Sequence, residues 1–545
     1  MKQKFPLLRA PFLLALLLLV AACGGSSPTP PPPAPPPPPP PPVNTGPTWT
    51  QGVFQPASQF EDRCAVVRTG VDIEGNPFPD RAGSLLEELF WLRSWTNETY
   101  LWNTEVQDRN PATFNDRLAY FAVLRTTATT PSGKDKDDFH FSQPTTEFLA
   151  QRNLAPSAGY GARLVSFSNT VPRDFRVLFT EPGSPAAQVV MGEANLVRGA
   201  RILKVDNVDL VNANTQAEVN ILNAGLFPTN AGEQHTFEVQ DPGAAFPRTI
   251  MMTSANISAK PVNRTAVINT PTGDVGYILF NTFSPFASEK EIADAIAAMN
   301  TQGVADIVLD LRYNGGGLLA VASQLGYMIA GNARTSGKTF ELLRFNAAAG
   351  NRNPVTGALN DPLPFFTTGL GFSLPDGAPL QTLNLPRVYI LSTGNTCSAS
   401  ESVINALRGI DVEVILIGGT TCGKPFGFFP TDNCGETYFT IQFQGVNNKN
   451  FGDYADGFIA QNSNAAFGVR IPGCAVADDL SRELGDQNEA LLAAALQYRA
   501  TGACPTPPSS VIAARSVRGD PSMAIDVPAA DGIFETNRDM RMPEF

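Results

Sequence analysis

The pattern of hydrophobic and polar positions changes twice along the chain. Between residues 82 and 102, apolar side chains recur three or four positions apart, which is the period of an amphipathic helix. Ser84 and Glu87 stand three residues apart at its start, as in a capping box. We therefore predict a helical N-terminal region over residues 49–156.

Short β-like runs separated by Gly and Pro follow over residues 157–262, and they predict a small β domain. From residue 263 to residue 504, apolar runs that suit buried strands alternate with helical patterns. The runs occupy residues 275–280, 307–311, 388–391 and 414–417. This alternation predicts a layered α/β core, so the expected fold class is multidomain α/β. Residues 505–545 show no periodicity and are predicted to form an irregular tail.

The start of the chain carries a targeting pattern. A basic stretch precedes the apolar run 11–22, which is too short to span a bilayer as a mature helix, so residues 1–22 are predicted to be a signal peptide. The ending Val-Ala-Ala-Cys at Cys23 resembles a bacterial lipobox, which implies that Cys23 is acylated. An ordinary signal peptide followed by a chance cysteine is the alternative.

Acyl chains on Cys23 would anchor the protein to a lipid bilayer. No aspartate follows Cys23, which favours the outer membrane of a bacterial envelope, facing the periplasm or the exterior. No later stretch is apolar for long enough to cross a bilayer. Residues 23–48 are rich in proline and predict a polyproline II stalk, with a docking site for a proline-binding module as the alternative.

Composition removes several classes of function. The chain has 39 Lys and Arg against 51 Asp and Glu, a formal charge of −12, which argues against a nucleic-acid partner. Its two histidines, His140 and His235, are too few for a multi-imidazole metal or haem site, so no metal or cofactor is expected. Six cysteines remain after Cys23 and predict disulfides in an exported protein. We prefer Cys422–Cys434 as a local pair because it closes a short loop.

Two segments contain candidate catalytic residues directly after predicted strands. Residues 310–317 read Asp-Leu-Arg-Tyr-Asn-Gly-Gly-Gly, and the glycines allow a sharp turn with N–H groups directed at an oxyanion. A plain strand-to-helix turn is the alternative. Residues 395–401 place Ser398 at the start of a helix, where the dipole favours developing negative charge. Ser398 with Glu401 fits a capping box equally well.

A third segment, Gly423-Lys424-Pro425, follows the last of the four predicted strands. Residues 418–424 have the spacing of a phosphate-binding loop. The next residue is Pro425 in place of Ser or Thr, however, and the following residues cannot begin the required helix. A nucleotide-binding function is therefore excluded for this loop.

Together the three segments resemble the C-terminal processing (tail-specific) serine peptidase family, over roughly residues 80–500. The family pattern is D-L-R-x-N-x-G-G, then a serine in S-A-S-E, then a lysine in G-K. The resemblance implies a ClpP/crotonase-like core in which Ser398 is the nucleophile and Lys424 the general base, 26 positions apart. It also implies an oxyanion hole made by the N–H of Ala399 and one of Gly316 or Gly317, and polypeptide substrates with C-terminal tails.

The β-rich residues 157–262 resemble a PDZ domain. Three segments carry the resemblance: residues 159–161, 181–187 and 197–207. A PDZ domain binds an extended C-terminal peptide as an added strand, with the carboxylate held by backbone N–H groups. By resemblance these groups belong to Gly159, Tyr160, Gly161 and Ala162. A small β domain without a ligand is the alternative.

A lysine acts as a base only if its pKa falls from about 10.4 towards about 7–8, which burial in an apolar pocket achieves. Phe426, Phe428 and Phe429 could form such walls. Many family members have a lysine-orienting glutamine four residues after the lysine, where this chain has Phe428, so Gln442 and Gln444 are the candidates for that role. Cys397, directly before the serine, could pin the catalytic turn if it is bonded.

Two other functions stay open at this point. A degenerate relative could bind peptides without cleaving them, and the missing glutamine slightly favours it. A Ser/Lys esterase or a β-lactamase-like acyl enzyme would act on small substrates without the PDZ-like domain. Both histidines are predicted to be structural, since nothing in the sequence places either beside Ser398.

Overall fold

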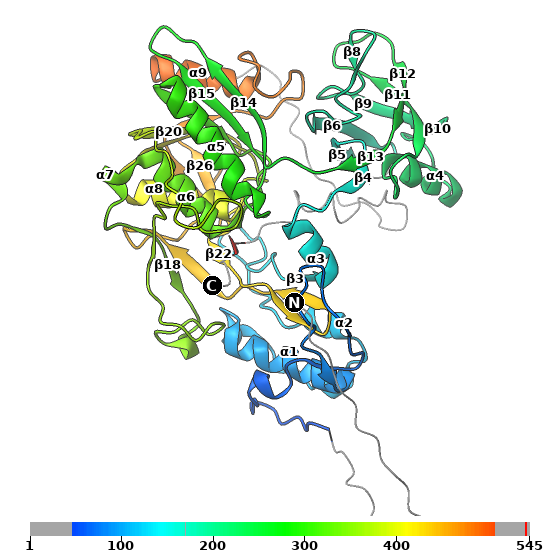
Figure 1. Ribbon diagram of the computed structural model, residues 1–545, viewed down its shortest axis with the longest axis vertical. Helices are drawn as coiled ribbons and strands as arrows, with labels where there is room; N and C mark the ends of the chain where they lie inside the picture. Colours follow the sequence, from blue (N-terminus) through cyan, green and yellow to red (C-terminus); the bar gives the residue numbers. More distant parts are fainter. Residues whose placement is uncertain (1–45, 169–170, 507–539, 542–545) are drawn as a thin grey trace, which may run out of the picture. The chain divides into compact units, whose positions relative to one another are not determined.

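The computed structural model describes residues 46–168, 171–506 and 540–541 (Figure 1). The predicted signal peptide, Cys23 and nearly all of the Pro-rich stretch lie outside the described residues. The largest sheet has the order β14-β15-β16-β20-β21-β28. Its strands are β14 (Val262–Ile268), β15 (Val275–Phe280), β16 (Asp306–Asp310), β20 (Arg387–Ser392), β21 (Glu413–Gly418) and β28 (Gly473–Ala475). They run parallel from β15 onward, and β14 pairs antiparallel with β15.

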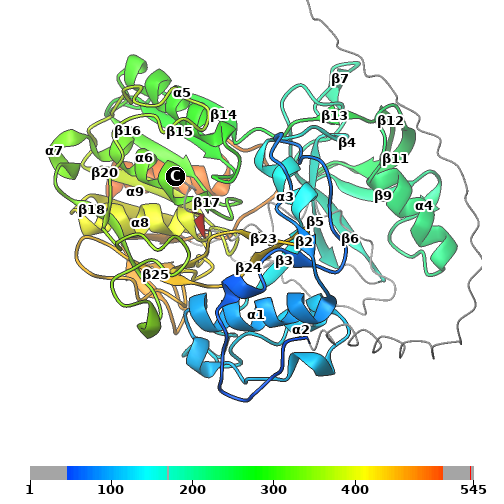
Figure 2. The ribbon, with the colours of Figure 1, turned by 60° about the horizontal axis from the view of Figure 1, so that its bottom comes forward.

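Helices cover both faces of this sheet (Figure 2). One apolar cluster joins the sheet to α5 (Ala287–Gln302), α6 (Leu319–Ala330) and α8 (Ala399–Gly409), and a second joins the opposite face to α9 (Ala490–Thr501). Along β15, Ile278 and Phe280 belong to the first cluster, whereas Tyr277 and Leu279 belong to the second. Because side chains alternate along a strand, a run that is apolar at every position is buried on both sides. The predicted α/β core is thus confirmed.

Smaller sheets surround this core. A four-stranded sheet has the order β19-β18-β25-β22, and a three-stranded sheet has the order β23-β24-β3. Their strands are β19 (Leu363–Pro364), β18 (Thr339–Arg344), β25 (Phe443–Val446), β22 (Phe426–Gly427), β23 (Thr431–Asn433), β24 (Glu436–Phe439) and β3 (Phe141–Pro144). The short strand β17 (Gly317–Leu318) pairs with β29 (Met540–Arg541), and β26 (Phe458–Ala460) pairs with β27 (Val469–Ile471). The helix α7 (Asn332–Thr335) follows α6.

The β-rich segment, residues 157–257, has a core of its own. Its main sheet has the order β12-β11-β9-β6-β5, with β10 paired to β9 and helix α4 (Gln216–Leu226) packed against it. The strands are β5 (Ala162–Ser168), β6 (Asp174–Thr180), β9 (Arg201–Val205), β10 (Val208–Asp209), β11 (Gln234–Gln240) and β12 (Arg248–Thr253). Strand β4 (Ser157–Gly159) pairs with β13 (Ala255–Ile257), so the chain enters and leaves the segment side by side. The strands β7 (Val189–Val190) and β8 (Glu193–Ala194) form a hairpin.

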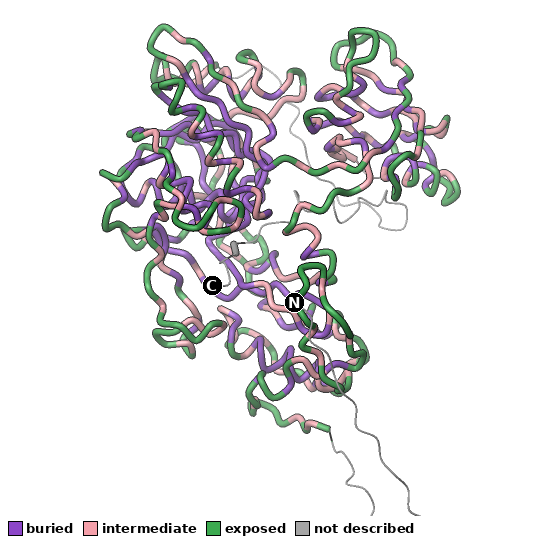
Figure 3. Tube along the Cα trace, viewed as in Figure 1, coloured by how far each residue is buried: buried purple, intermediate pink, exposed green. Residues whose placement is uncertain are grey.

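The N-terminal region contains less helix than the sequence predicts. Its α-helices are α1 (Leu85–Thr99), α2 (Arg117–Phe121) and α3 (Thr145–Arg152), and three single-turn 3-10 helices occupy Ala57–Gln59, Asn103–Glu105 and Pro111–Thr113. Besides β3, the rest is mainly turns with the short parallel pair β1 (Arg63–Cys64) and β2 (Arg81–Ala82). Ser84 caps α1 as predicted, accepting the N–H of Glu87 at 3.3 Å. Strand β3 pairs with β24, which joins this region to the core; β24 is buried throughout, whereas the residues of β3 are intermediate or exposed (Figure 3).

The six cysteines form three disulfides: Cys64–Cys434, Cys397–Cys422 and Cys474–Cys504. The predicted pair Cys422–Cys434 is wrong. Cys434 lies in the turn between β23 and β24, against the N-terminal region that carries Cys64, whereas Cys422 lies beside the Ser398 turn. Proximity in the fold, and not loop length, decided the pairing. Among the described residues, no helix is both long enough and apolar enough to span a bilayer.

Candidate active site

Ser398 stands at the N-terminus of α8, on the turn that follows β20. Its side chain is fully buried, and its backbone has φ 59°, a left-handed conformation that non-glycine residues adopt only at a cost. Ser398 and Glu401 form the capping box that the sequence allows, but the Oγ atom makes no hydrogen bond of normal geometry among the described residues. The hydroxyl therefore has no strong hydrogen bond at a helix N-terminus, where developing negative charge is stabilised.

Lys424 lies in the segment between β21 and β22 and is also fully buried. Its Nζ atom lies 4.3 Å from the ring centre of Phe428 and 4.9 Å from that of Phe139. Phe428 was among the predicted walls. Phe139 was not, because it belongs to the N-terminal region and no sequence spacing connects it to the lysine. Pairing of β3 with β24 brings that region to the core.

Glu401, in the first turn of α8, connects the serine to the lysine. Its Oε2 atom accepts the backbone N–H of Ser398 at 3.1 Å and that of Lys424 at 2.8 Å. Its Oε1 atom accepts the N–H of Gly423 at 2.9 Å and the hydroxyl of Thr421 at 2.5 Å. Burial raises the pKa of Glu401 above its usual range, and these hydrogen bonds oppose the rise. One carboxyl group thus holds both predicted catalytic residues by their main chains.

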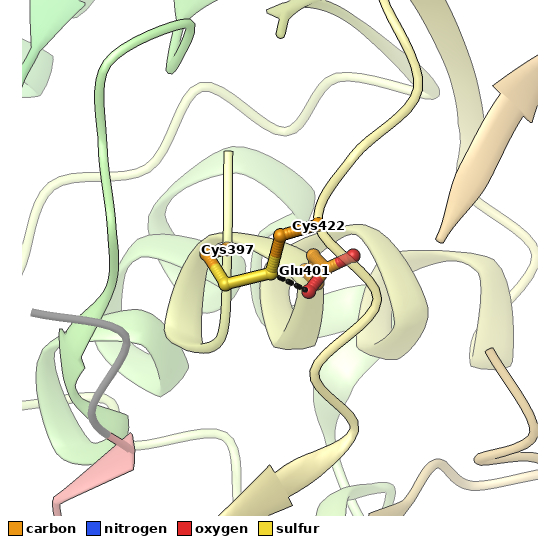
Figure 4. A group of neighbouring side chains, drawn as sticks. All are labelled: Cys397, Glu401 and Cys422. Atoms are coloured by element: carbon orange, nitrogen blue, oxygen red, sulfur yellow. Dashed lines mark hydrogen bonds between the residues drawn. A yellow bond between two sulfur atoms is a disulfide. The ribbon is translucent and has the colours of Figure 1, made fainter. Parts of the chain in front are cut away.

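A disulfide forms a second connection between the same two segments. Cys397 precedes Ser398 and is bonded to Cys422, with the Cα atoms 5.2 Å apart and Cys422 Sγ 3.3 Å from the Glu401 carboxylate (Figure 4). The three side chains cluster closely enough to suggest a metal site. The sulfurs are joined to each other, however, so neither offers the thiolate that a metal requires. For the same reason Cys397 is not a nucleophile.

The glycine segment lies against the Ser398 turn. Gly316 has φ 111°, and a Cβ atom there would stand 2.7 Å from the Cβ of Ser398 and 3.0 Å from the nitrogen of Ala399. The N–H of Gly316 donates to the side chain of Asn314 at 2.9 Å. Of the two predicted glycine donors, Gly316 therefore already has an acceptor for its N–H group.

Behind the glycines, Arg312 is fully buried in a charged cluster. It donates to Asp310 at 2.9 Å, to Glu489 at 2.7 Å and to Asp478 at 2.8 Å. Burial disfavours the charged guanidinium, yet the three carboxylates outweigh this effect and hold the pKa of Arg312 well above its ordinary value. The cluster fixes the end of β16, from which the glycine segment begins.

The other residues predicted to contact the lysine pack or hydrogen-bond elsewhere. Phe426 packs on Trp102, and Phe429 packs on Phe443. Gln442 accepts the N–H of Phe429 at 2.7 Å, whereas Gln444 donates to the carbonyl of Gly452 at 2.9 Å.

The histidines have structural partners. The side chain of His140 is buried; it bonds to Thr440 and to the carbonyl of Phe121 and stacks on the Phe121 ring. His235 lies on β11 and bonds to Asp206 at 2.5 Å.

Gly159, Tyr160, Gly161 and Ala162 line a cavity of about 360 Å³ in the β-rich segment. Apolar side chains form much of its wall, including Leu164, Phe227 and Met252. The four predicted peptide-binding residues therefore do share one cavity, at the start of β5.

The fold and this site define an α/β protein with a buried serine at a helix N-terminus and a buried lysine tethered to it. Residues 274–431 match the family model described as Peptidase family S41, so this chain contains an S41 peptidase domain. It is 26% identical over 269 residues to a chloroplastic C-terminal processing peptidase of Tetradesmus obliquus, over 46% of this chain and 51% of that protein. It is 33% identical over 137 residues to a carboxyl-terminal-processing protease of Synechocystis sp., over 25% of this chain and 30% of that protein.

The chain spans about half, or less, of the length of these curated relatives. A crystal structure from Bacteroides fragilis, described as an S41 protease, superposes with a TM-score of 0.57 at 24% identity. The superposition covers 76% of this chain and 97% of that one. The two proteins therefore share a fold.

Proposed function

We propose that this protein is a serine endopeptidase of the C-terminal processing type, with Ser398 as nucleophile and Lys424 as general base. The observation that carries the proposal is the shared acceptor: both residues donate their backbone N–H groups to Oε2 of Glu401. Two segments from different strand ends thus meet at one atom, with both side chains buried. The S41 match and the names of the relatives support the same class of reaction.

In this mechanism Ser398 Oγ attacks the carbonyl carbon of the scissile peptide bond and its proton passes to the neutral amine of Lys424. The N–H groups of Ala399 and Gly317 stabilise the oxyanion, each worth about 3 kcal/mol. The protonated amine then gives its proton to the leaving amino group. Water next attacks the acyl-enzyme, with Lys424 as base again. The aromatic walls exclude bulk water from the amine.

The proposal includes a PDZ-like role for the β-rich segment. An extended C-terminus would add a strand beside β5, with its carboxylate at the backbone N–H groups of residues 159–162. The cavity that these residues line supports this role, since its apolar wall suits an apolar terminal side chain. The substrates would be polypeptides with accessible C-terminal tails.

The test compares the wild type with Ser398→Ala and Lys424→Ala on an unfolded protein and on a peptide with a free C-terminus. We expect cleavage and fluorophosphonate labelling by the wild type, and loss of both in each variant by at least about 1,000-fold. Equal activity in all three proteins would overturn the assignment.

One observation favours a second candidate, a peptide-binding protein without turnover: Phe428 stands where many family members have the lysine-orienting glutamine. That candidate predicts tight binding of the peptide by the wild type without any cleavage. A small-molecule acyl enzyme predicts instead that an ester or a β-lactam is hydrolysed at the same rate whether or not the cavity of the β-rich segment is blocked.

We further propose that Cys23 is acylated and anchors the protein to a bacterial envelope membrane. The support is the basic start, the apolar run and the lipobox-like ending. In a bacterial host, Cys23→Ala should move the protein from the detergent-extracted membrane fraction to the soluble fraction. Unchanged fractionation together with an unmodified N-terminal mass would contradict lipidation.

A further inference from the structure

The segment that carries Lys424 has little regular structure of its own. Residues 419–425 form neither helix nor strand. Three of these seven residues, Thr421, Gly423 and Lys424, hydrogen-bond to Glu401, and a fourth, Cys422, is bonded to Cys397. The segment is also held by backbone hydrogen bonds to Ser392, Thr396 and Phe458. The turn at Cys397 and the first turn of α8 nevertheless contact four consecutive residues of it, Lys424 included.

The turn that carries Ser398 depends in its turn on the contacts that Cys397 and Glu401 make with the lysine segment. Its positive φ is a strained conformation, which persists only where the surroundings over-determine it. Cys397 on one side of the serine and Glu401 on the other both reach to the lysine segment. The two links therefore restrain the serine and the lysine together.

We infer that the Cys397–Cys422 disulfide and Glu401 are positioning groups for the Ser398/Lys424 pair, and that the site is competent only while the disulfide is formed. This inference rests on the proposed function. Reduction by a dithiol would begin with attack of its thiolate on one cysteine sulfur, giving a mixed disulfide, and its second thiol would then displace that sulfur. Two electrons and two protons pass to the cysteines as the reductant forms its own disulfide. Cys422 is partly exposed and offers a point of attack, whereas Cys397 is buried.

The chain offers a matched control for the disulfide. Cys474–Cys504 closes a loop of similar length, with a sequence separation of 30 against 25 for Cys397–Cys422, and both lie in the core. Loops of similar length contribute similarly to stability in the chain-entropy account. The double variant Cys474→Ala/Cys504→Ala should therefore lose comparable stability without touching the Ser398 turn.

Glu401→Gln tests the second link without a change of size. Each carboxylate oxygen of Glu401 accepts hydrogen bonds from two donors. A glutamine presents an NH₂ group to one of these pairs, because one amide end cannot accept. Either the Ser398 and Lys424 pair or the Thr421 and Gly423 pair must then lose its acceptor.

The experiment measures fluorophosphonate labelling of Ser398, kcat and KM for a tailed peptide, and thermal unfolding, on the full protein. We expect Cys397→Ala/Cys422→Ala and Glu401→Gln to lower kcat and the labelling rate by about 10- to 100-fold with little change in KM. The Cys474/Cys504 control should stay within about twofold of the wild type. Equal loss in the control and in the Cys397/Cys422 variant would overturn the inference.

Two further measurements apply if the Cys397/Cys422 variant does not fold or the wild type shows no turnover. In the control variant, reversible treatment with dithiothreitol should lower the labelling rate by about the same 10- to 100-fold, and reoxidation should restore it. Hydrogen exchange at the amides of Ser398, Gly423 and Lys424 should quicken on reduction. Unchanged exchange overturns the positioning role. A failure of the proposed function gives a different result. The wild type is then not labelled and does not cleave the peptide, although hydrogen exchange at these amides still quickens on reduction.

Discussion

Ser398 and Lys424 donate their backbone N–H groups to one oxygen atom, Oε2 of Glu401. The two residues come from the ends of neighbouring parallel strands, β20 and β21. Parallel strands end at the same edge of a sheet, and ligands commonly bind outside the carboxyl ends of strands in open α/β sheets. The sheet thus brings the two segments together, and Glu401 fixes the contact between them.

Gly316→Ala should disable the site. The new Cβ would stand 2.7 Å from the Cβ of Ser398, in a backbone conformation with φ 111° that disfavours any side chain. Displacing the serine by about 1 Å costs about 100-fold in rate. We expect a loss of this size in kcat/KM. Gly303→Ala is the control, since Gly303 also has positive φ but no atom within 4 Å of its added Cβ, and its activity should match that of the wild type.

Leu164→Lys should weaken the capture of tailed substrates. Leu164 lines the cavity that contains residues 159–162, and a charge there must be desolvated when an apolar C-terminal side chain binds. We expect KM for the tailed peptide to rise about tenfold, with kcat and fluorophosphonate labelling unchanged. Val190→Lys, at an exposed position outside the cavity, should leave both constants as they are. A KM unchanged by Leu164→Lys would contradict the PDZ-like role.

Arg312→Ala should destabilise the fold. The fully buried carboxylates of Asp310 and Glu489 would lose the charge that compensates them, which typically costs about 3–5 kcal/mol. Chemical denaturation measures this loss of unfolding free energy. Arg387→Ala is the control, because Arg387 is partly exposed and Asp306 keeps its second partner Arg499, and it should cost about 1 kcal/mol or less.

Stability should fall with rising pH because of Glu341. Burial raises the pKa of Glu341 to about 8 from its ordinary 4.5, against the effect of a hydrogen bond from Ser402. Above pH 4.5 the unfolded chain releases this proton while the folded protein keeps it. The group therefore lowers the unfolding free energy by about 1.4 kcal/mol per pH unit, up to about pH 8.

Glu341→Gln removes this titrating group at nearly constant volume. Relative to the wild type, the variant should gain stability steadily as the pH rises from about 5 to about 8, as denaturant titrations at several pH values would show. Glu413→Gln, at an exposed position, should follow the wild type. Parallel curves for the wild type and Glu341→Gln would show that the Glu341 carboxyl is not protonated in the fold.

Local sequence patterns predicted the regular elements of the core well. The four predicted strands coincide with β15, β16, β20 and β21 to within one residue at each end. The predicted helix start at Ser84 and the serine at the N-terminus of α8 are also present. These features depend on periodicity and capping, which neighbouring residues determine.

The N-terminal region was harder to predict. Its aromatic spacing predicted α1, but the remainder folds mainly as turns that gain their order from β24 and from the Cys64–Cys434 disulfide. Contacts this distant in the chain leave no periodic signal nearby. The wrong pairing of Cys422 with Cys434 has the same cause, since short separation was the only guide that the sequence offered.

By itself, the sequence determined the strand and helix order of the core, the three motif segments, and the serine, lysine and glycines that they contain. Only the tertiary structure decided which groups surround that lysine and what holds it beside the serine: Phe139 from the N-terminal region, the Cys397–Cys422 bond, and Glu401 as a common acceptor. The reason is physical. Spacing along a chain fixes local conformation, whereas contacts between distant segments exist only after the sheet has aligned the ends of its strands.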